Sequence, residues 1–331
     1  MTILTNFQRF PERWHSASGL RGRTITRATL WQFLRALPKC DLVIVNGDTN
    51  LVFFLSVIWF VFPFLKKPIL AHDIILRQPK TKLARLKARI KRILLSRIDH
   101  FTLHFRAMDG YQKYFNIAPE RASHVPSKPN IRYRYEYRSS PDGEYVLCFG
   151  RSERDYDTFF EAMSGLPYPA AIPAPNFEQF RRHASRFTWR ISDLPANVRI
   201  LEDDGSQESL IRIIENSRLV VLPTVASRIS ASGIGTYLTA MLLSKCVIMS
   251  EGPGTSDVLT NELLIVPVED SVALRDTIRR AWDDDDLRLR TAEAGRQYSE
   301  WCGGEPELRQ RVLDQALEHC ILNRRSHHPI R

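Results

Sequence analysis

Residues 219–241 read LVVLPTVASRISASGIGTYLTAM, and this stretch decides the fold class. It begins with apolar residues, passes through a loop of small and polar residues, and becomes apolar again after Gly235. The pattern predicts a buried strand over Leu219–Leu222 and a helix over Thr236–Leu243. A strand that leads through a short loop into a helix is the repeating unit of parallel sheets covered by helices.

Similar units lie on both sides of this stretch. Short apolar runs predict further strands over Tyr145–Phe149, Ala170–Ile172, Val198–Leu201, Cys246–Met249 and Leu263–Val266. Helices are expected between them, over 155–163, 206–216 and 271–282. Because strands and helices alternate, the second half of the chain is expected to form an α/β domain with a parallel sheet.

The first half shows a shorter series of the same kind. Strands are predicted over Asp41–Val45, Pro68–Ala71 and His100–Leu103, and residues 136–145 have the composition of a linker. A chain of 331 residues is long enough for two domains. We expect a Rossmann-like domain over 1–138, a second over 139–300, and a C-terminal helix and tail over 301–331 that can pack back on the first.

The composition is that of a folded protein, with 44% hydrophobic and 25% charged residues, and it excludes disordered, collagen-like and coiled-coil chains. The five cysteines show no metal-ligand spacing, so we expect reduced, mostly buried thiols in a cytosolic compartment. No run of twenty apolar residues is present and residues 1–13 are polar, so neither a membrane-spanning helix nor a secretory signal is expected.

Charge is unevenly divided along the chain. The formal net charge is +10, of which residues 1–140 carry +17 and residues 141–331 carry −7. The first half is therefore expected to meet an anionic surface or ligand.

Two loops carry residues suited to an anion. The strand over 145–149 ends in Gly150, and Arg151 and Arg154 follow at the start of the next helix. Gly233 and Gly235 allow a close approach to the backbone where the later helix begins. Helix N-termini and guanidinium groups both favour bound phosphate, although either loop alone is equally compatible with an ordinary strand–helix turn.

The order of these features resembles the donor-binding domain of GT-B glycosyltransferases of family 4. The likeness extends from about residue 145 to 298 and rests on the order of five segments, with which residues 266–282 and 287–298 agree. The segments are the arginine-bearing loop after the first strand, IIENSRLVVLP at 213–223, Ser-Gly-x-x-Thr-x-Leu-x-Ala-Met at 232–241, Lys-Cys-Val-Ile at 245–248, and Asp-Val-Leu at 257–259.

The resemblance implies a GT-B fold, in which two Rossmann-like domains with parallel sheets face a central cleft. It further implies that a nucleotide-sugar donor binds in the second domain, with Arg151 and Arg154 on the diphosphate. The remaining donor-binding residues would be Gly150, Ser232, Gly233, Ile234, Gly235 and Thr236, with Thr239 on the ribose side. No metal ion and no further cofactor is expected.

One feature departs from the family pattern. Retaining members usually carry two glutamates seven residues apart in this segment, and the matching positions here are Ser232 and Thr239. The departure leaves two alternatives beside sugar transfer: a non-catalytic subunit that binds nucleotide sugar or a partner enzyme, and an enzyme that epimerises a nucleotide sugar.

The first half offers candidates for the acceptor side. His72 and Asp73 directly follow the strand over 68–71, so they are expected at its carboxyl end. His72 can act as a base near neutral pH or orient a hydroxyl, and Asp73 is the better proton acceptor if the reaction inverts. A helix cap beside a structural histidine is the alternative. The glycine-rich loop that the family places after its first strand has one candidate, Ser16–Gly22.

Two segments suggest a membrane surface. Residues 51–65 (LVFFLSVIWFVFPFL) are apolar throughout, and predict either a buried helix between two strands or a helix that dips into lipid. Residues 80–97 contain eight Lys and Arg and no acidic residue, with leucine and isoleucine at helical spacing. An anionic membrane surface contacted by residues 51–97 is the expected partner; a solvated helix and a nucleic-acid-binding module are the alternatives.

Together these patterns predict a cytoplasmic enzyme, peripheral at the inner face of a membrane. It would move a sugar from a nucleotide-diphosphate donor to a lipid-linked saccharide during polysaccharide or glycolipid assembly.

Overall fold

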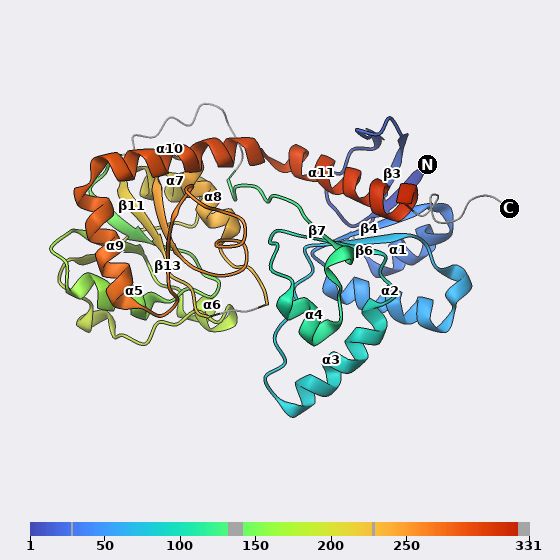
Figure 1. Ribbon diagram of the computed structural model, residues 1–331, viewed down its shortest axis with the longest axis horizontal. Coiled ribbons are helices and arrows are strands. Elements are labelled where there is room, and N and C mark those ends of the chain that lie inside the picture. Colours follow the sequence, from blue (N-terminus) through green and yellow to red (C-terminus); the bar gives the residue numbers. More distant parts are fainter. Residues whose placement is uncertain (28, 132–141, 227–228, 324–331) are drawn as a thin grey trace. The chain divides into compact units, whose positions relative to one another are not determined.

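The computed structural model describes residues 1–27, 29–131, 142–226 and 229–323, and the chain forms two compact units (Figure 1). Unit 1 comprises residues 1–126, 228–230 and 305–331, and unit 2 comprises residues 127–227 and 231–304.

Unit 1 is built on a seven-stranded sheet in the order β2-β3-β1-β4-β5-β6-β7. All neighbouring strands are parallel except β2 and β3, which are antiparallel. The strands are β1 (Thr2–Thr5), β2 (Arg13–His15), β3 (Arg21–Thr26), β4 (Leu42–Asn46), β5 (Ile69–His72), β6 (His100–Leu103) and β7 (Ala122–His124). Asn46 pairs with His72, and His72 with Thr102, so the carboxyl ends of β4, β5 and β6 lie side by side.

The helices of unit 1 are α1 (Leu30–Ala36), α2 (Thr49–Val61), α3 (Lys82–Leu95), α4 (Asp109–Phe115) and α11 (Glu305–Leu317). Shorter turns are η1 (Leu37–Lys39), η2 (Pro63–Leu65), η3 (Pro119–Arg121) and the π-helical η5 (Glu318–Leu322). Asp48 caps α2, since its carboxylate accepts a hydrogen bond from the Leu51 N–H. Leu308, Val312 and Leu313 of α11 are buried in one cluster with Ile3 and Leu42, so this helix belongs to the core of unit 1.

Unit 2 contains a six-stranded sheet in the order β10-β9-β8-β11-β12-β13, and all its neighbouring strands are parallel. The strands are β8 (Tyr145–Cys148), β9 (Ala170–Pro173), β10 (Val198–Leu201), β11 (Ser217–Leu222), β12 (Cys246–Ser250) and β13 (Leu264–Val266). Tyr145 and Leu147 pack into one core cluster, and Val146 and Cys148 into another. The central strand is thus buried on both faces, which explains its continuous apolar sequence.

The helices of unit 2 are α5 (Tyr156–Ser164), α6 (Phe177–Arg182), α7 (Gln207–Glu215), α8 (Ile234–Leu242), α9 (Ser271–Asp283) and α10 (Asp285–Cys302), with a short turn η4 (Ile191–Asp193). Side chains of α5 and α9 cover one face of the sheet, and those of α7 and α8 cover the other.

The α/β class with parallel sheets is confirmed in both units, and all five cysteines are buried thiols, as expected. The prediction for Ser16–Gly22 is wrong: this segment joins β2 to β3, and Gly22 pairs with Trp14 in that antiparallel hairpin. It therefore does not form the loop after the first parallel strand, because a hairpin turn returns the chain along the same edge of the sheet.

For residues 51–65 the sequence left two alternatives, a fully buried helix or a helix that dips into lipid; the structure contradicts the fully buried one, because only one side of the helix is buried. Helix α2 ends at Val61, and Leu51, Val52, Leu55 and Trp59 are buried on one side of it. The opposite side and the η2 turn remain exposed, with Phe60 51% and Phe64 80% accessible.

Candidate functional site

The candidate donor site of unit 2 is formed by the loops after β8 and β11, which are neighbouring strands. After β8 the chain turns at Gly150, whose φ of +112° suits glycine. Arg154 of this loop forms a single antiparallel bridge with Thr224 of the loop after β11. Asp155 then caps α5 by accepting from the Thr158 N–H. These contacts fix the position of Arg154.

Arg154 is a buried cation. Its side chain is 1% exposed, with Nε donating to the Phe149 carbonyl (3.0 Å) and Nη1 to the Ser152 carbonyl (3.1 Å). Among the described residues, no carboxylate forms an ion pair with Arg154, and the hydrogen bonds of its side chain are donated by Nε and Nη1. Burial lowers the pKa of this guanidinium, but arginine keeps its proton in proteins.

Two glycines make room for this guanidinium. A Cβ atom at Gly150 would lie 2.6 Å from its Nε, and one at Gly233 would lie 2.6 Å from its Nη2. The structure therefore brings Arg154 and Gly233 together from separate strand–helix units of one sheet, as the sequence predicted for a shared phosphate site.

The N-terminus of α8 begins at the same point. Gly233 is the N-cap with a φ of +81°, and no side chain caps the helix. The N–H groups of Thr236 and Tyr237 donate to the Gly233 carbonyl, whereas those of Ile234 and Gly235 precede the first helical acceptor. Free N–H groups and the helix dipole favour an anion there.

The arrangement thus places a buried guanidinium, which forms no ion pair with a carboxylate of the described residues, beside a helix N-terminus. A buried charge without a counter-ion is costly, and a bound anion would supply the missing partner. This chemistry fits a phosphate or diphosphate.

The other predicted donor-binding residues differ from Arg154 in how far their side chains are buried. The Arg151 side chain is exposed, while its carbonyl accepts from the Ser185 hydroxyl (2.8 Å). Ser232 and Thr236 are partly buried beside Gly233. The Ile234 side chain is buried, packing close to Gly254, so this residue can offer its backbone only.

Thr239 holds the framework of unit 2. It is 1% exposed, and its hydroxyl donates to the Gly235 carbonyl (2.6 Å) and accepts from the Asn130 N–H (2.9 Å). The predicted hydrogen bond to a ribose competes with these contacts, and the geometry does not support it.

The candidate acceptor residues of unit 1 lie at the carboxyl ends of β5 and β6. His72 is 1% exposed, and its Nδ1 lies 3.0 Å from the Thr102 hydroxyl. Asp73 follows with a φ of +49°, an unusual conformation for a residue with a side chain, and its side chain is 43% exposed. His104 Nε2 lies 3.9 Å from the Asp73 carboxylate, while its Nδ1 lies 2.8 Å from the Val125 carbonyl.

Burial affects the protonation of His72 and Asp73 in different ways. It lowers the pKa of His72 well below its ordinary value, with a smaller contribution from His104, so His72 is neutral at pH 7. Desolvation raises the pKa of Asp73, and His104 partly opposes this effect. Since His72 is enclosed, its predicted contact with an acceptor hydroxyl is not supported, and Asp73 is the predicted residue that a ligand can reach.

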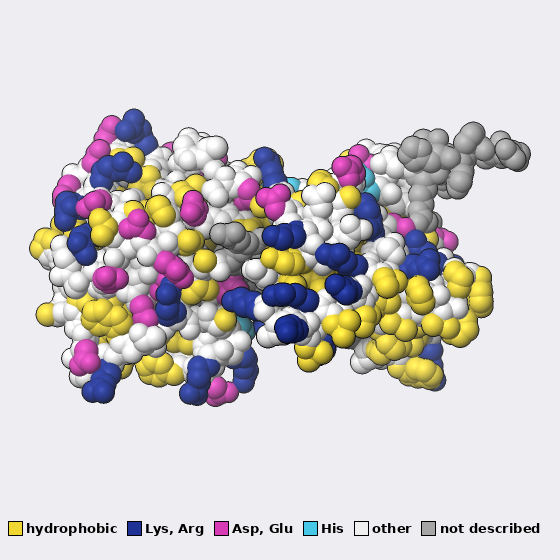
Figure 2. All heavy atoms as spheres, turned by 60° about the horizontal axis from the view of Figure 1, so that its bottom comes forward, with side chains coloured by type: hydrophobic (Ala, Val, Ile, Leu, Met, Phe, Trp, Pro, Cys, Tyr) yellow, Lys and Arg dark blue, Asp and Glu magenta, His cyan; other side chains and the backbone are white. Residues whose placement is uncertain are grey.

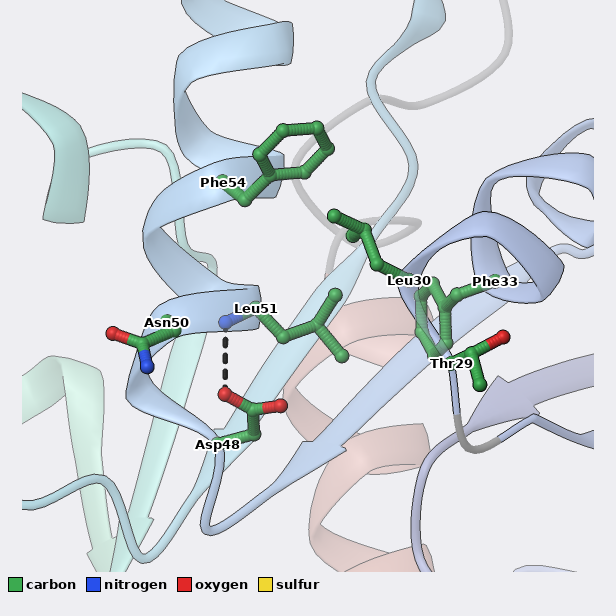
Figure 3. Close-up of a pocket in the computed structure, with 7 residues that line it drawn as sticks. All are labelled: Thr29, Leu30, Phe33, Asp48, Asn50, Leu51 and Phe54. Carbon is green, nitrogen blue, oxygen red and sulfur yellow. Dashed lines mark hydrogen bonds between the residues drawn. The ribbon is translucent and has the colours of Figure 1, made fainter.

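A pocket of about 220 Å³ opens between α1 and α2 in unit 1 (Figure 3). Its apolar lining comes from both helices, and Asp48 and Asn50 lie at one side, at the start of α2; the full lining is Thr29, Leu30, Phe33, Asp48, Asn50, Leu51 and Phe54. Helix α2 follows β4, so the pocket lies at the same edge of the sheet as His72.

The sequence did not lead us to three residues that contribute to the two candidate sites. One is His104, which directly follows β6, whereas His72 is the last residue of β5. Because a histidine stands at the carboxyl end of both strands, the sequence could have indicated His104. Asn130 and Ser185, which anchor the two donor loops, are polar residues in segments without a motif.

Within the described residues, no group of three His, Cys, Asp or Glu side chains is arranged to hold a metal ion. In the same part of the chain, no helix combines the length and the apolar character that crossing a membrane requires.

Comparison with solved structures identifies the architecture. Anabaena Alr3699/HepE, solved in complex with UDP, superposes with a TM-score of 0.65 at 14% identity, over 87% of this chain and 81% of that chain. The chain has the GT-B glycosyltransferase fold. This result confirms the fold implied by residues 145–298.

Two further GT-B structures match along most of the chain. Sucrose-phosphate synthase from Thermosynechococcus elongatus gives a TM-score of 0.62 at 14% identity, over 96% of this chain and 88% of that chain. The α,α-trehalose 6-phosphate synthase from Burkholderia multivorans gives 0.59 at 13% identity, over 90% and 75%. No protein-family model and no curated protein sequence matches the chain.

Proposed function

We propose that this protein transfers a sugar from a nucleotide-diphosphate donor to an acceptor. One observation carries the proposal: Arg154 is a buried cation, without a carboxylate partner among the described residues, between Gly150 and Gly233 at the start of α8. The donor diphosphate would provide the counter-ion. As the nucleoside diphosphate leaves, its growing negative charge would be stabilised by the same guanidinium and helix N-terminus.

Uridine diphosphate is the first donor base to test. The similar HepE protein was crystallised with UDP and with UDP-glucose. The site residues that we assign to the diphosphate are Arg154 and the backbone of Gly233, Ile234 and Gly235, with Ser232 and Thr236 at the edge of the loop.

The reaction that we propose forms a bond between an acceptor hydroxyl oxygen and the anomeric carbon of the donor sugar. The bond from that carbon to the diphosphate oxygen breaks, and the nucleoside diphosphate leaves with the electron pair. The hydroxyl proton passes to a base. Asp73 is the candidate, because its carboxylate is accessible at the carboxyl end of β5, where a ligand can reach it. His72 and His104 would act as positioning residues.

We propose a lipid-linked saccharide as the acceptor, and a peripheral location at the inner, cytoplasmic face of a membrane during polysaccharide or glycolipid assembly. The support is the surface of unit 1, where α3 carries many cations and exposes apolar side chains. Such helices lie in the interface of anionic bilayers.

Isothermal titration of the full chain with UDP, GDP and ADP tests the donor assignment. At least one nucleotide should bind, and Arg154→Ala should weaken it about tenfold or more, as expected for loss of a charge-assisted hydrogen bond. Arg154→Lys, which keeps the charge, should recover part of the affinity. Arg190→Ala is the control, because this exposed arginine of unit 2 is not among the predicted donor residues and its loss should leave nucleotide affinity unchanged.

The result that overturns the assignment is equal nucleotide affinity for wild type and a folded Arg154→Ala variant. Thermal unfolding monitored by circular dichroism shows whether each variant is folded.

A second function is favoured by one observation. Ser232 and Thr239 stand where retaining family members carry glutamates, and Thr239 is buried and occupied by framework hydrogen bonds. A non-catalytic subunit that binds nucleotide sugar would have this site. Donor binding without release of nucleoside diphosphate, in the presence of lipid-linked saccharides, would favour that function; sugar transfer by the purified chain would exclude it.

A further inference from the structure

Helix α3 turns most of its apolar side chains toward solvent, whereas an ordinary surface helix turns them toward the core. Its buried residues are Ala88 and Leu95, whereas the apolar residues at helical spacing point outward. This exposed row consists of Leu83, Leu86, Ile90 and Ile93, between 55% and 61% accessible. A soluble surface helix normally turns its apolar stripe to the core, so an outward stripe indicates a partner that is itself apolar.

Helix α2 and the η2 turn extend this apolar surface. Phe54, Val57, Phe60 and Val61 of α2 are between 39% and 58% exposed, and Phe64 of η2 is 80% exposed. Figure 2 shows hydrophobic side chains gathered over one region of this face, with Lys and Arg side chains beside them.

The neighbouring cations indicate what covers this surface. Lys91 of α3 lies over the Phe53 ring of α2 (4.9 Å), and Arg97, two residues after the end of α3, lies over Phe60 (5.3 Å). Cations of α3 and of the segment after it therefore flank the apolar side chains of α2. The α3 helix itself contains no acidic residue. Apolar side chains flanked by cations are complementary to a bilayer with anionic headgroups. The apolar side chains can enter the acyl region, and the cations can contact the headgroup phosphates.

The pocket between α1 and α2 continues this surface. On α2, Phe53 and Phe60 face α3 and Phe54 lines the pocket, while Val57 and Val61 lie between these two sides of the helix. At its other end the pocket reaches Asp48, two residues after Asn46, which pairs with His72. The Gly47 N–H donates to the His72 carbonyl (2.9 Å). The pocket therefore extends from Phe54, on the exposed side of α2, to Asp48, at the edge of the sheet where β4 and β5 end.

We propose that the pocket between α1 and α2 binds the hydrocarbon chain of a lipid acceptor, drawn from an anionic bilayer on which α2 and α3 lie. The chain occupies the space between Leu30, Phe33, Leu51 and Phe54, and the polar end of the lipid lies near Asp48 and Asn50. This inference rests on the proposed function for the identity of the acceptor, and it names the part of that acceptor which unit 1 recognises.

Photolabelling of the full chain tests the site. The probe is a vesicle of phosphatidylcholine and phosphatidylglycerol that contains a trace of phosphatidylglycerol with a diazirine on one acyl chain. After irradiation, mass spectrometry should find label on peptides covering 29–33 and 50–54, as well as on the exposed residues of α2 and α3.

Leu30→Arg combined with Phe54→Arg places charges in the pocket, and both positions are about 40% exposed, at 43% and 39%, so the fold should persist. This variant should lose about nine-tenths of the pocket label and keep the label on α3, since a charged side chain excludes a hydrocarbon chain. The matched control is Phe177→Arg with Leu289→Arg in unit 2, where the exposures are 44% and 42%; its label should equal that of wild type.

Three results overturn the proposal. They are label confined to α3 and residues 57–65, pocket label unchanged in the Leu30→Arg/Phe54→Arg variant, and pocket label obtained only from soluble diazirine-bearing decanoic acid without vesicles. The last result would assign the pocket to a free small apolar molecule. Nucleotide titration of the same samples separates this proposal from the donor assignment, because the donor residues that we propose all lie in unit 2.

Discussion

The guanidinium of Arg154 occupies the space that a side chain at position 233 would need, since a Cβ atom there would lie 2.6 Å from Nη2. Gly233→Ala should therefore displace Arg154 and weaken nucleotide binding about tenfold or more. It should also cost about 1–2 kcal/mol of stability, because the φ of +81° is strained for alanine. Nucleotide titration and urea unfolding measure the two effects.

Gly205→Ala is the control for this variant. Gly205 has a similar φ of +75°, but nothing lies within 4 Å of its hypothetical Cβ atom. The substitution should reproduce the backbone strain and leave nucleotide affinity unchanged. If Gly233→Ala also binds nucleotide like wild type, the two residues do not form a shared phosphate site.

Thr239→Val separates a framework role from a ligand-binding role. Valine has a similar shape but cannot accept the hydrogen bond of the Asn130 N–H. We expect a loss of about 1 kcal/mol in the free energy of unfolding and little change in nucleotide affinity. The opposite result, a large loss of UDP affinity with unchanged stability, would restore the ribose contact that the sequence resemblance implied.

The sequence predicted the elements whose pattern is local. Strands such as β8 and β12 are apolar runs because both faces of the sheet are covered. Strand β1 (TILT) is four residues long, with two apolar residues between two threonines, and the hairpin formed by β2 and β3 is short. Such segments bury little apolar surface by themselves, and their pairing depends on distant partners.

Long-range packing also limited the prediction of the site. The motif order identified Arg151 and Arg154 together, but only the approach of Gly233, from another strand–helix unit, shows that Arg154 is the buried one. Likewise, the periodicity of α3 predicted an amphipathic helix, whereas which side packs depends on the neighbouring helices. Ala88 faces inward because a small side chain allows close approach.

The environment of His100 predicts a pH-dependent stability. His100 stacks on His319 at a ring distance of 3.8 Å, and its Nε2 lies 2.7 Å from the Ser123 hydroxyl. Desolvation, with smaller contributions from His319 and Arg121, lowers the pKa of His100 from 6.5 to about 3. Between these values the unfolded chain binds the proton and the folded chain does not. Stability is therefore complete above about pH 6.5 and falls as the pH decreases toward 3.

His100→Phe should remove this contribution. Between pH 6.5 and 4 the free energy of unfolding of wild type should change more steeply than that of the variant, by up to about 1.4 kcal/mol per pH unit. Urea unfolding at several pH values measures the slopes, and substitution of the exposed His15 by phenylalanine is the control. Parallel slopes for wild type and His100→Phe would show that His100 is protonated in the folded state.

The exposed stripe of α3 predicts a specific loss of membrane binding. Leu86→Glu combined with Ile90→Glu replaces two side chains that are each 55% exposed, so folding should be unaffected. Binding to phosphatidylglycerol-containing vesicles should fall about tenfold or more, because two apolar side chains are lost and two negative charges are added near an anionic surface. Vesicle sedimentation measures the bound fraction.

Val272→Glu combined with Leu289→Glu is the matched control, since these residues are 58% and 42% exposed on the helices of unit 2. The control adds the same charge to the chain without touching α3, and its vesicle binding should change by less than about threefold, as distant charges are screened. Wild-type binding should also weaken with added salt and be absent for pure phosphatidylcholine. Equal vesicle binding by the α3 variant and the control would contradict a membrane-facing α3. If wild type binds RNA more strongly than vesicles at about 150 mM salt, the nucleic-acid alternative is favoured instead.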